Sequence, residues 1–243
     1  RWLYMDQWET GGNIATGLYN VASPYTFYRQ KTVGNTDIHW EVVRKFNFGI
    51  DYSFLDGLFA GNIEIFRDKR SDILISGSDR AMPSYFGGIV NAPWVNMGKV
   101  KNRGYELELR INKTLRNSLH LWANMNMTHA VNEIIEADDP ELLPDYQKDA
   151  GKSIGQTHTY VDHGYTQTMD DIYGSTAFES NDDQKLPGTY YILDYNGDGV
   201  INSYDQIPYG YSSSPQNTYS ASLGFDYKGW SFFVQFYGVN NVT

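Results

Sequence analysis

The chain has 243 residues, a formal net charge of −10 and no cysteine, so disulfides and thiolate metal sites are excluded. The negative charge argues against nucleic acid as a partner, because it would repel the phosphates. The 20 tyrosines, 12 phenylalanines and 23 glycines favour strands over helices. No run of 18 apolar residues indicates a transmembrane helix. A membrane β-barrel is compatible with the sequence, because barrel strands never show such a run.

Residues 1–34 show no sustained periodicity and are predicted to form a loop. The first predicted strand covers residues 40–54, where apolar side chains alternate with polar ones. Its length of about 15 residues exceeds the five or six that are usual in soluble proteins. A tight turn at Asp56-Gly57 leads into a return strand over residues 58–69.

The middle of the sequence contains two more long strands and a large irregular segment. A polar loop over residues 76–98 precedes a third strand, predicted for residues 99–113, and a fourth follows over residues 119–131. The segment 132–216 is acidic and irregular, and within it residues 154–167 are expected to form one strand with weaker alternation.

The last two strands form the clearest hairpin of the sequence. Residues 219–227 and 230–237 alternate in polarity on either side of a Lys228-Gly229 turn. Six long strands are thus predicted, with three tiny turns alternating with large loops. Short turns at one rim and long loops at the other are typical of outer-membrane barrels.

A transmembrane antiparallel β-barrel is therefore the predicted fold, and aromatic residues near the strand ends fit interfacial girdles. A soluble β-sandwich would show the same alternation, with its apolar face turned into a core. Strand length and the asymmetry of the loops favour the membrane. Six strands cannot close a wide barrel, so the chain is interpreted as one part of a larger barrel.

A motif typical of calcium-binding loops runs from Asp194 to Asp205 and reads DYNGDGVINSYD. Its oxygen-bearing residues and Gly199 follow the spacing of a loop that wraps a hard cation with six to eight oxygen ligands. The predicted structural Ca²⁺ ligands are the side chains of Asp194, Asn196, Asp198 and Asp205, the carbonyl of Val200 and, through water, Asn202. The alternative is a series of Asn-Gly and Asp-Gly turns with solvated carboxylates.

Five segments, in order, resemble a known family. They are NTDIHWE at 35–41, FGID at 48–51, NMGKVKNRGYE at 96–106, PGTYYILDYNGDG at 187–199 and YKGW at 227–230. The series resembles the C-terminal part of the barrel in SusC/RagA-type TonB-dependent outer-membrane transporters of Bacteroidota. Three departures from the family pattern are Thr36, where proline is usual, Thr189-Tyr190 after Gly188 in place of an aspartate, and Pro208-Tyr209-Gly210 in place of a Gly-Asn-Pro run.

This resemblance implies a complete barrel of about 22 strands. It also implies a function and a set of partners. It implies TonB-dependent import of oligomeric nutrients, glycans or peptides, across the bacterial outer membrane, without enzymatic activity. A SusD-like surface lipoprotein would close over the barrel, and TonB would act through a plug domain that lies outside residues 1–243. The excursion 132–216 would then be extracellular.

The alternative function is a soluble, secreted calcium-binding β domain for adhesion or assembly. His158 and His163 are five residues apart and would face opposite sides of a strand, so they suggest neither a metal site nor catalysis and are interpreted as solvated loop histidines. No general acid/base pair is recognisable in the sequence. Loop aromatics could stack on sugars, contact a partner or pack against one another. These are Tyr85, Phe86, Trp94, Tyr160, Tyr165 and Tyr173.

Overall fold

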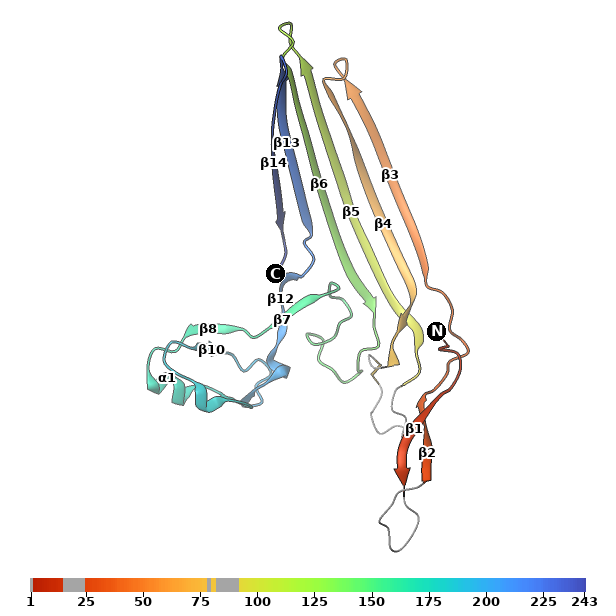
Figure 1. The fold of residues 1–243 in the computed structure, drawn as a ribbon. Coiled ribbons are helices and arrows are strands. Elements are labelled where there is room, and N and C mark those ends of the chain that lie inside the picture. Colours follow the sequence, from red (N-terminus) through yellow and green to blue (C-terminus); the bar gives the residue numbers. More distant parts are fainter. Residues whose placement is uncertain (1, 15–24, 78–79, 82–91) are drawn as a thin grey trace, which may run out of the picture.

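The computed structural model describes residues 2–14, 25–77, 80–81 and 92–243. Its main feature is one antiparallel sheet with the strand order β14-β13-β6-β5-β4-β3 (Figure 1). The strands are β3 (Val42–Phe54), β4 (Phe59–Ile75), β5 (Val95–Thr114), β6 (His120–Glu136), β13 (Asn217–Tyr227) and β14 (Trp230–Asn240). All six predicted strands are therefore present and pair as a single sheet.

The register of the sheet places the alternating residues of all strands on two distinct faces. Opposite partners share a face, and one row runs from Ile50 through Ile63, Leu107 and Met127 to Tyr219. The adjacent row, from Asp51 through Asn62 and Glu108, lies on the other face. The sheet thus has an outward apolar face and an inner polar face, as the sequence pattern predicts.

The outward apolar face is not covered by any other part of the described chain. Phe46, Phe48, Ile50, Phe232 and Phe236 are all more than half exposed. In the described ranges, Ala123 and Ile201 are the only buried hydrophobic residues. The accessible surface of 17126 Å² also exceeds the roughly 11,000 Å² expected for a self-contained folded chain of 27.8 kDa. A soluble sandwich would bury this face, so the arrangement fits a lipid-facing wall.

The apolar face has the height of a bilayer. On β6 its members run from Leu121 to Val131, which is about 34 Å along the strand and about 26 Å after a tilt of 40°. Beyond Val131 the same face becomes charged, and Lys101 forms an ion pair with Glu133 at 2.6 Å. At the opposite end it finishes near Trp230, which is 78% exposed. The wall therefore matches the apolar band of about 25 Å in outer-membrane barrels.

The connections of the sheet differ between its two ends. The turns between β3 and β4, β5 and β6, and β13 and β14 all lie at one end, and the long segments leave from the other (Figure 1). Lys228 and Gly229 both have positive φ, at 47° and 86°, in the last of these turns. The predicted asymmetry of short turns and long loops is confirmed.

The prediction of a loop over residues 1–34 is wrong. β1 (Gln7–Ile14) pairs antiparallel with β2 (Tyr25–Thr32) in a separate two-stranded sheet. The register shifts between Thr10 and Gly12, where an irregularity interrupts the pairing. Because such a shift breaks the period of two, the sequence pattern does not reveal these short strands.

Three strands are longer than predicted at the end that carries the long loops. β4 reaches Ile75, β5 begins at Val95 and β6 continues to Glu136. In this extension Lys99 pairs with Glu136 in the ladder and forms an ion pair with it. Charged residues occupy the outward face there, so strand pairing continues after the apolar alternation has ended.

The irregular segment contains several short elements rather than one weak strand. The expected strand over 154–167 is divided into β7 (Gln156–Thr159) and β8 (Asp162–Tyr165), which pair with different partners, β12 (Ile207–Ser212) and β10 (Tyr190–Ile192). Between β8 and β12 the chain also forms α1 (Met169–Gly174), β9 (Ala177–Phe178) and β11 (Val200–Ile201). Two 3-10 turns lie in the same segment, at Asp182–Gln184 and Ser203–Asp205. Because β6 continues to Glu136, the excursion predicted for residues 132–216 begins only at residue 137, and from here on the term means residues 137–216.

No helix in the described residues is both long enough and apolar enough to cross a membrane.

Candidate functional site

The predicted calcium-type loop lies in the excursion between β10 and β12. The carboxylate of Asp194 accepts hydrogen bonds from the backbone N–H of Gly197 at 2.8 Å, Asp198 at 3.2 Å and Gly199 at 2.8 Å. Gly197 and Gly199 have φ values of 74° and 88°, which side chains rarely adopt. The sequence therefore winds this segment tightly around the carboxylate of its first residue.

Asp205 closes the loop from its other end. This carboxylate is fully buried and accepts backbone hydrogen bonds from Tyr195 at 2.8 Å, Asn196 at 3.3 Å and Asn202 at 2.9 Å. A buried charge is stable only where it is hydrogen-bonded or paired, and three N–H donors supply that stabilisation here. Asp205 thus ties together the backbone at both ends of the loop.

The loop is joined to the end of β6 through residues 139–150. The hydroxyl of Tyr146 and the amide of Gln147 both donate to the carbonyl oxygen of Tyr204, at 2.8 and 2.9 Å. The Tyr146 ring packs edge-on against Tyr195, with ring centroids 4.9 Å apart. Burial, followed by the nearby Asp205 charge, raises the pKa of Tyr146 above its ordinary value. The loop is therefore anchored near the barrel wall.

The predicted calcium ligands are close in sequence and lie in one small loop. No group of three His, Cys, Asp or Glu side chains in the described residues is arranged to hold a metal ion. The predicted set differs from such a group, because it also uses an amide oxygen from Asn196 and the carbonyl of Val200. None of the ion pairs among the described residues neutralises Asp194, Asp198 or Asp205. The calcium site stays a prediction.

A second candidate site is a cavity of about 400 Å³ on the inner polar face, at the end with the long loops. Its floor is formed by β3 to β6, and its wall by residues 153–154 and 212–216. Ser212 is almost fully buried and donates to the carbonyl oxygen of Ile154 at 2.6 Å. The side chain of Asn132 accepts from the Ile154 N–H at 2.7 Å. The excursion thus folds over the inner face at its start and end.

Four polar residues cross the floor of this cavity from strand to strand. Lys45 lies opposite Asp68, Asp68 opposite Asn102, and Asn102 opposite Asn132. We call these four residues the mouth row. Asp68, Asn102 and Asn132 are half-buried, whereas Lys45 is exposed on β3. Sequence reasoning missed this set, because it predicted polar faces but could not align the four strands.

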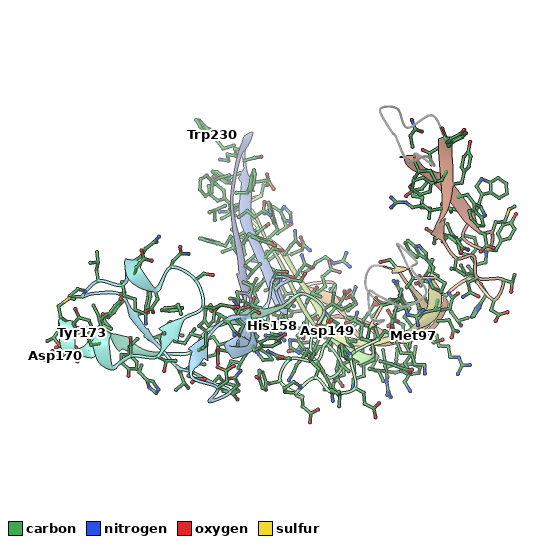
Figure 2. The ribbon with its side chains drawn as sticks, turned by 90° about the horizontal axis from the view of Figure 1, so that it is seen from below. Met97, Asp149, His158, Asp170, Tyr173 and Trp230 are labelled. Carbon is green, nitrogen blue, oxygen red and sulfur yellow. The ribbon has the colours of Figure 1, made fainter. Side chains whose placement is uncertain are left out.

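The loop aromatics have different environments. Tyr165 stacks on Tyr190 with centroids 4.9 Å apart, which matches the expectation that some of these rings pack on each other. Tyr173 is 79% exposed, and Figure 2 shows it beside Asp170 at the outer end of the excursion. Tyr85 and Phe86 lie outside the described residues. The excursion therefore carries both packed and free aromatic side chains.

The two histidines singled out in the sequence lie on separate strands. His158 belongs to β7 and His163 to β8, so they are not opposite sides of one strand as expected. His163 packs against Tyr191 with centroids 6.4 Å apart. The His158 Nε2 atom is buried with no hydrogen-bond partner in the structure, so the interpretation of His158 as a solvated histidine is wrong. They do not form a common site.

Comparison with known proteins identifies a family that matches nearly the whole chain and relatives that match parts of it. Residues 1–242 match the family described as "TonB dependent receptor-like, beta-barrel". TonB-dependent receptor P39 of Formosa agariphila is 29% identical over 162 residues, which are 61% of this chain and 15% of that protein. TonB-dependent receptor SusC of Bacteroides thetaiotaomicron is 27% identical over 199 residues, 79% of this chain and 18% of that protein. The chain thus spans less than a fifth of these relatives.

Solved structures with the same fold include two of the RagAB system. A chain from the structure of the RagAB peptide transporter has a TM-score of 0.67 and 19% identity. A chain from the RagAB peptide importer in the open-open state has a TM-score of 0.65 and 18% identity. Each match covers 99% of this chain and 24% of the other. At this identity the similarity establishes the fold.

Proposed function

This chain belongs to the family of TonB-dependent receptor-like β-barrels, and from that premise we propose that the protein imports oligomeric nutrients across the outer membrane. Membership confirms the resemblance to SusC/RagA-type transporters, the partial antiparallel barrel and the outer-membrane location. It also confirms that the protein is not an enzyme, because the family consists of transporters. The alternative of a soluble secreted domain is thereby set aside.

The observation that carries the proposal is the contrast between the two faces of the sheet. The outward face is apolar over the height of a bilayer, whereas the inner face presents carboxylates, amides and hydroxyls such as Glu108, Asn126 and Ser220. A closed barrel with these faces encloses a polar interior. The cavity at the long-loop end opens onto this interior, which suits entry of a hydrophilic oligomer, a glycan or a peptide.

We further propose that a SusD-like surface lipoprotein docks on the excursion and that TonB supplies the energy. The excursion leaves the end of the sheet opposite the tight turns, so in outer-membrane topology it is extracellular (Figure 1). Its outer part exposes Tyr173, Tyr190 and Leu186, which are 79%, 56% and 65% exposed. Exposed aromatic residues of this kind are enriched at protein interfaces.

Structural Ca²⁺ in the loop of residues 194–205 is part of the same proposal. Three carboxylates lie within 12 residues without an ion-pair partner in the described chain, and a cation would offset their repulsion. Each carboxylate retains lone pairs beyond those used by backbone N–H groups. The ion would hold the excursion in place through Tyr146 and Gln147, without taking part in chemistry.

Deletion of the gene tests the proposed function. Cells without it should fail to grow on one oligomeric nutrient while keeping all surface hydrolase activity, and growth on the corresponding monomers should be unchanged. The full-length protein should also co-purify with a lipoprotein that cross-links to the excursion. Normal growth of the deletion strain on every oligomer tested, or hydrolytic turnover by the purified barrel, would contradict the proposal.

A further inference from the structure

Five basic side chains lie together on the outward face of the sheet, where its apolar band ends beside the long loops. They belong to two adjacent rows of the strand ladder. One row consists of Phe46, Arg67, Arg103 and Val131, and the next of Arg44, Lys69, Lys101 and Glu133. We call Arg44, Arg67, Lys69, Lys101 and Arg103 the basic cluster. The two rows carry a net charge of +4, in a chain whose total charge is −10.

The described part of the chain leaves most of this positive charge unbalanced. Arg67 stands directly opposite Arg103, and Lys69 directly opposite Lys101. Like charges in directly opposite positions destabilise a sheet. Glu133 forms an ion pair with Lys101 at 2.6 Å, but no ion pair among the described residues involves any other member of the basic cluster. A negative charge from outside the chain would offset this repulsion.

The depth of the basic cluster matches the headgroup layer of a membrane. The apolar band on β6 ends at Val131, which stands opposite Arg103. Long basic side chains at such a boundary extend toward the headgroups and keep their charge there. Near the tight turns, Lys113 is the one basic residue that the described strands place on this face. The positive charge therefore lies in one leaflet, which is the outer leaflet when the long loops are extracellular (Figure 1).

A hollow of about 690 Å³ adjoins the basic cluster, and most of the residues that line it belong to the outward face. Arg67 and Arg103 line its side toward the long loops, and Ile65 and Tyr105 line its side toward the apolar band. The Tyr105 ring stacks on His129 with centroids 5.1 Å apart, so two rings of the lining support each other. The hollow thus joins an apolar surface to two guanidinium groups.

From the paired rows, their depth and the hollow we propose that the basic cluster binds the phosphorylated headgroup of an outer-leaflet lipid. The phosphate lies between Arg67 and Arg103, whose strands are about 4.8 Å apart, so both guanidinium groups donate to it. The acyl chains lie in the hollow, against Ile65 and Tyr105. This inference concerns the lipid around the protein. It rests on the outer-membrane location and on extracellular long loops, and it is independent of which nutrient is imported.

Native mass spectrometry of the delipidated full-length protein in detergent tests this inference. The probes are lipid A with a single phosphate and the same lipid A after removal of that phosphate. The wild type should bind the phosphorylated form about tenfold more tightly, because charge-assisted hydrogen bonds to phosphate are strong. Arg67→Gln combined with Arg103→Gln should reduce this preference to less than about twofold. Arg67→Lys combined with Arg103→Lys should give an intermediate preference, since the charge remains and the bidentate geometry is lost.

Lys113→Gln is the matched control, because Lys113 is exposed on the same face at the opposite end of the sheet. It should change the preference less than about twofold, and all variants should keep the heat-modifiable migration of a folded barrel. Equal binding of both lipids by the wild type, or a preference that survives both arginine-to-glutamine changes, would overturn the inference. Displacement of the phosphorylated lipid by millimolar inorganic phosphate would also overturn it, because the site would then take free phosphate. Import is measured separately, through growth of the deletion strain.

Discussion

Leu223 provides the sharpest test of which face of the sheet meets lipid. It lies on the outward face of β13, opposite Ala123 on one side and Val234 on the other. Tyr219 and Tyr227 occupy the same face, each four residues away, which is about 13 Å along the strand. Ala123, the partner of Leu223 on β6, lies within the apolar band that this strand carries from Leu121 to Val131, so Leu223 faces the hydrocarbon part of the bilayer.

Replacing Leu223 by arginine should therefore cost about 2 kcal/mol of unfolding free energy, because a basic residue facing lipid costs about 2–4 kcal/mol at the midplane and less toward the interfaces. The matched change Ser222→Arg places the same group on the inner face, between Asn124 and Gln235. There the guanidinium remains among polar groups, and the cost should stay below about 1 kcal/mol. The difference between the two variants isolates the effect of the face from that of the added bulk.

Both variants would be measured as full-length protein folded into lipid vesicles, with unfolding followed by tryptophan fluorescence during denaturant titration. A lower midpoint for Leu223→Arg alone, with an unchanged denaturant slope, is the expected result. Equal destabilisation by the two substitutions would refute the reasoning, because it would mean that both faces are packed as in a soluble protein.

Three further predictions concern the excursion. Asp205→Ala should cost about 2–4 kcal/mol of local stability, because it removes a buried carboxylate that accepts three backbone hydrogen bonds. Limited proteolysis should then cut within residues 194–205, and unchanged proteolysis would contradict this role. Millimolar Ca²⁺ should protect the loop from proteolysis in the wild type, and Asp198→Ala should abolish this protection while membrane insertion stays intact. Protection from proteolysis that survives the substitution would count against the predicted ligands. Hydrogen bonds from Gln167 and Thr168 lower the pKa of Asp171. The stability that the Asp171 carboxylate gives to the start of α1 is therefore complete above the ordinary pKa of 3.8 and is lost as the pH falls through the lower pKa of the folded state. NMR should show the start of α1 released only in that acidic range, and Asp171→Asn should remove this pH-dependent change.

The period-two pattern was sufficient to predict the wall of the barrel. Strands such as β13 alternate strictly because one face meets lipid and the other meets polar groups, and that physical contrast is visible in the sequence. The residues at which the strands end were less predictable. At the long-loop end both faces carry charged residues, so β6 extends to Glu136 without a change that the pattern could reveal.

The candidate sites differ in how far the sequence could specify them. The loop from Asp194 to Asp205 is local, and spacing alone places its residues together. The mouth row is not local, because Lys45 and Asn132 lie 87 positions apart in the chain and meet only through three strand pairings. Likewise, β1 and β2 were missed because their irregular register removes the alternation.

Uptake of a labelled oligomeric nutrient by living cells tests the central claim most directly. A fluorescent oligosaccharide and a fluorescent oligopeptide, each too large for passive diffusion, would be supplied to cells with and without the gene, and their arrival in the periplasm followed over time. The account predicts uptake that requires the gene and stops when a protonophore removes the energy source of TonB. Uptake that persists without the gene or after the protonophore, with the protein correctly inserted, would contradict it.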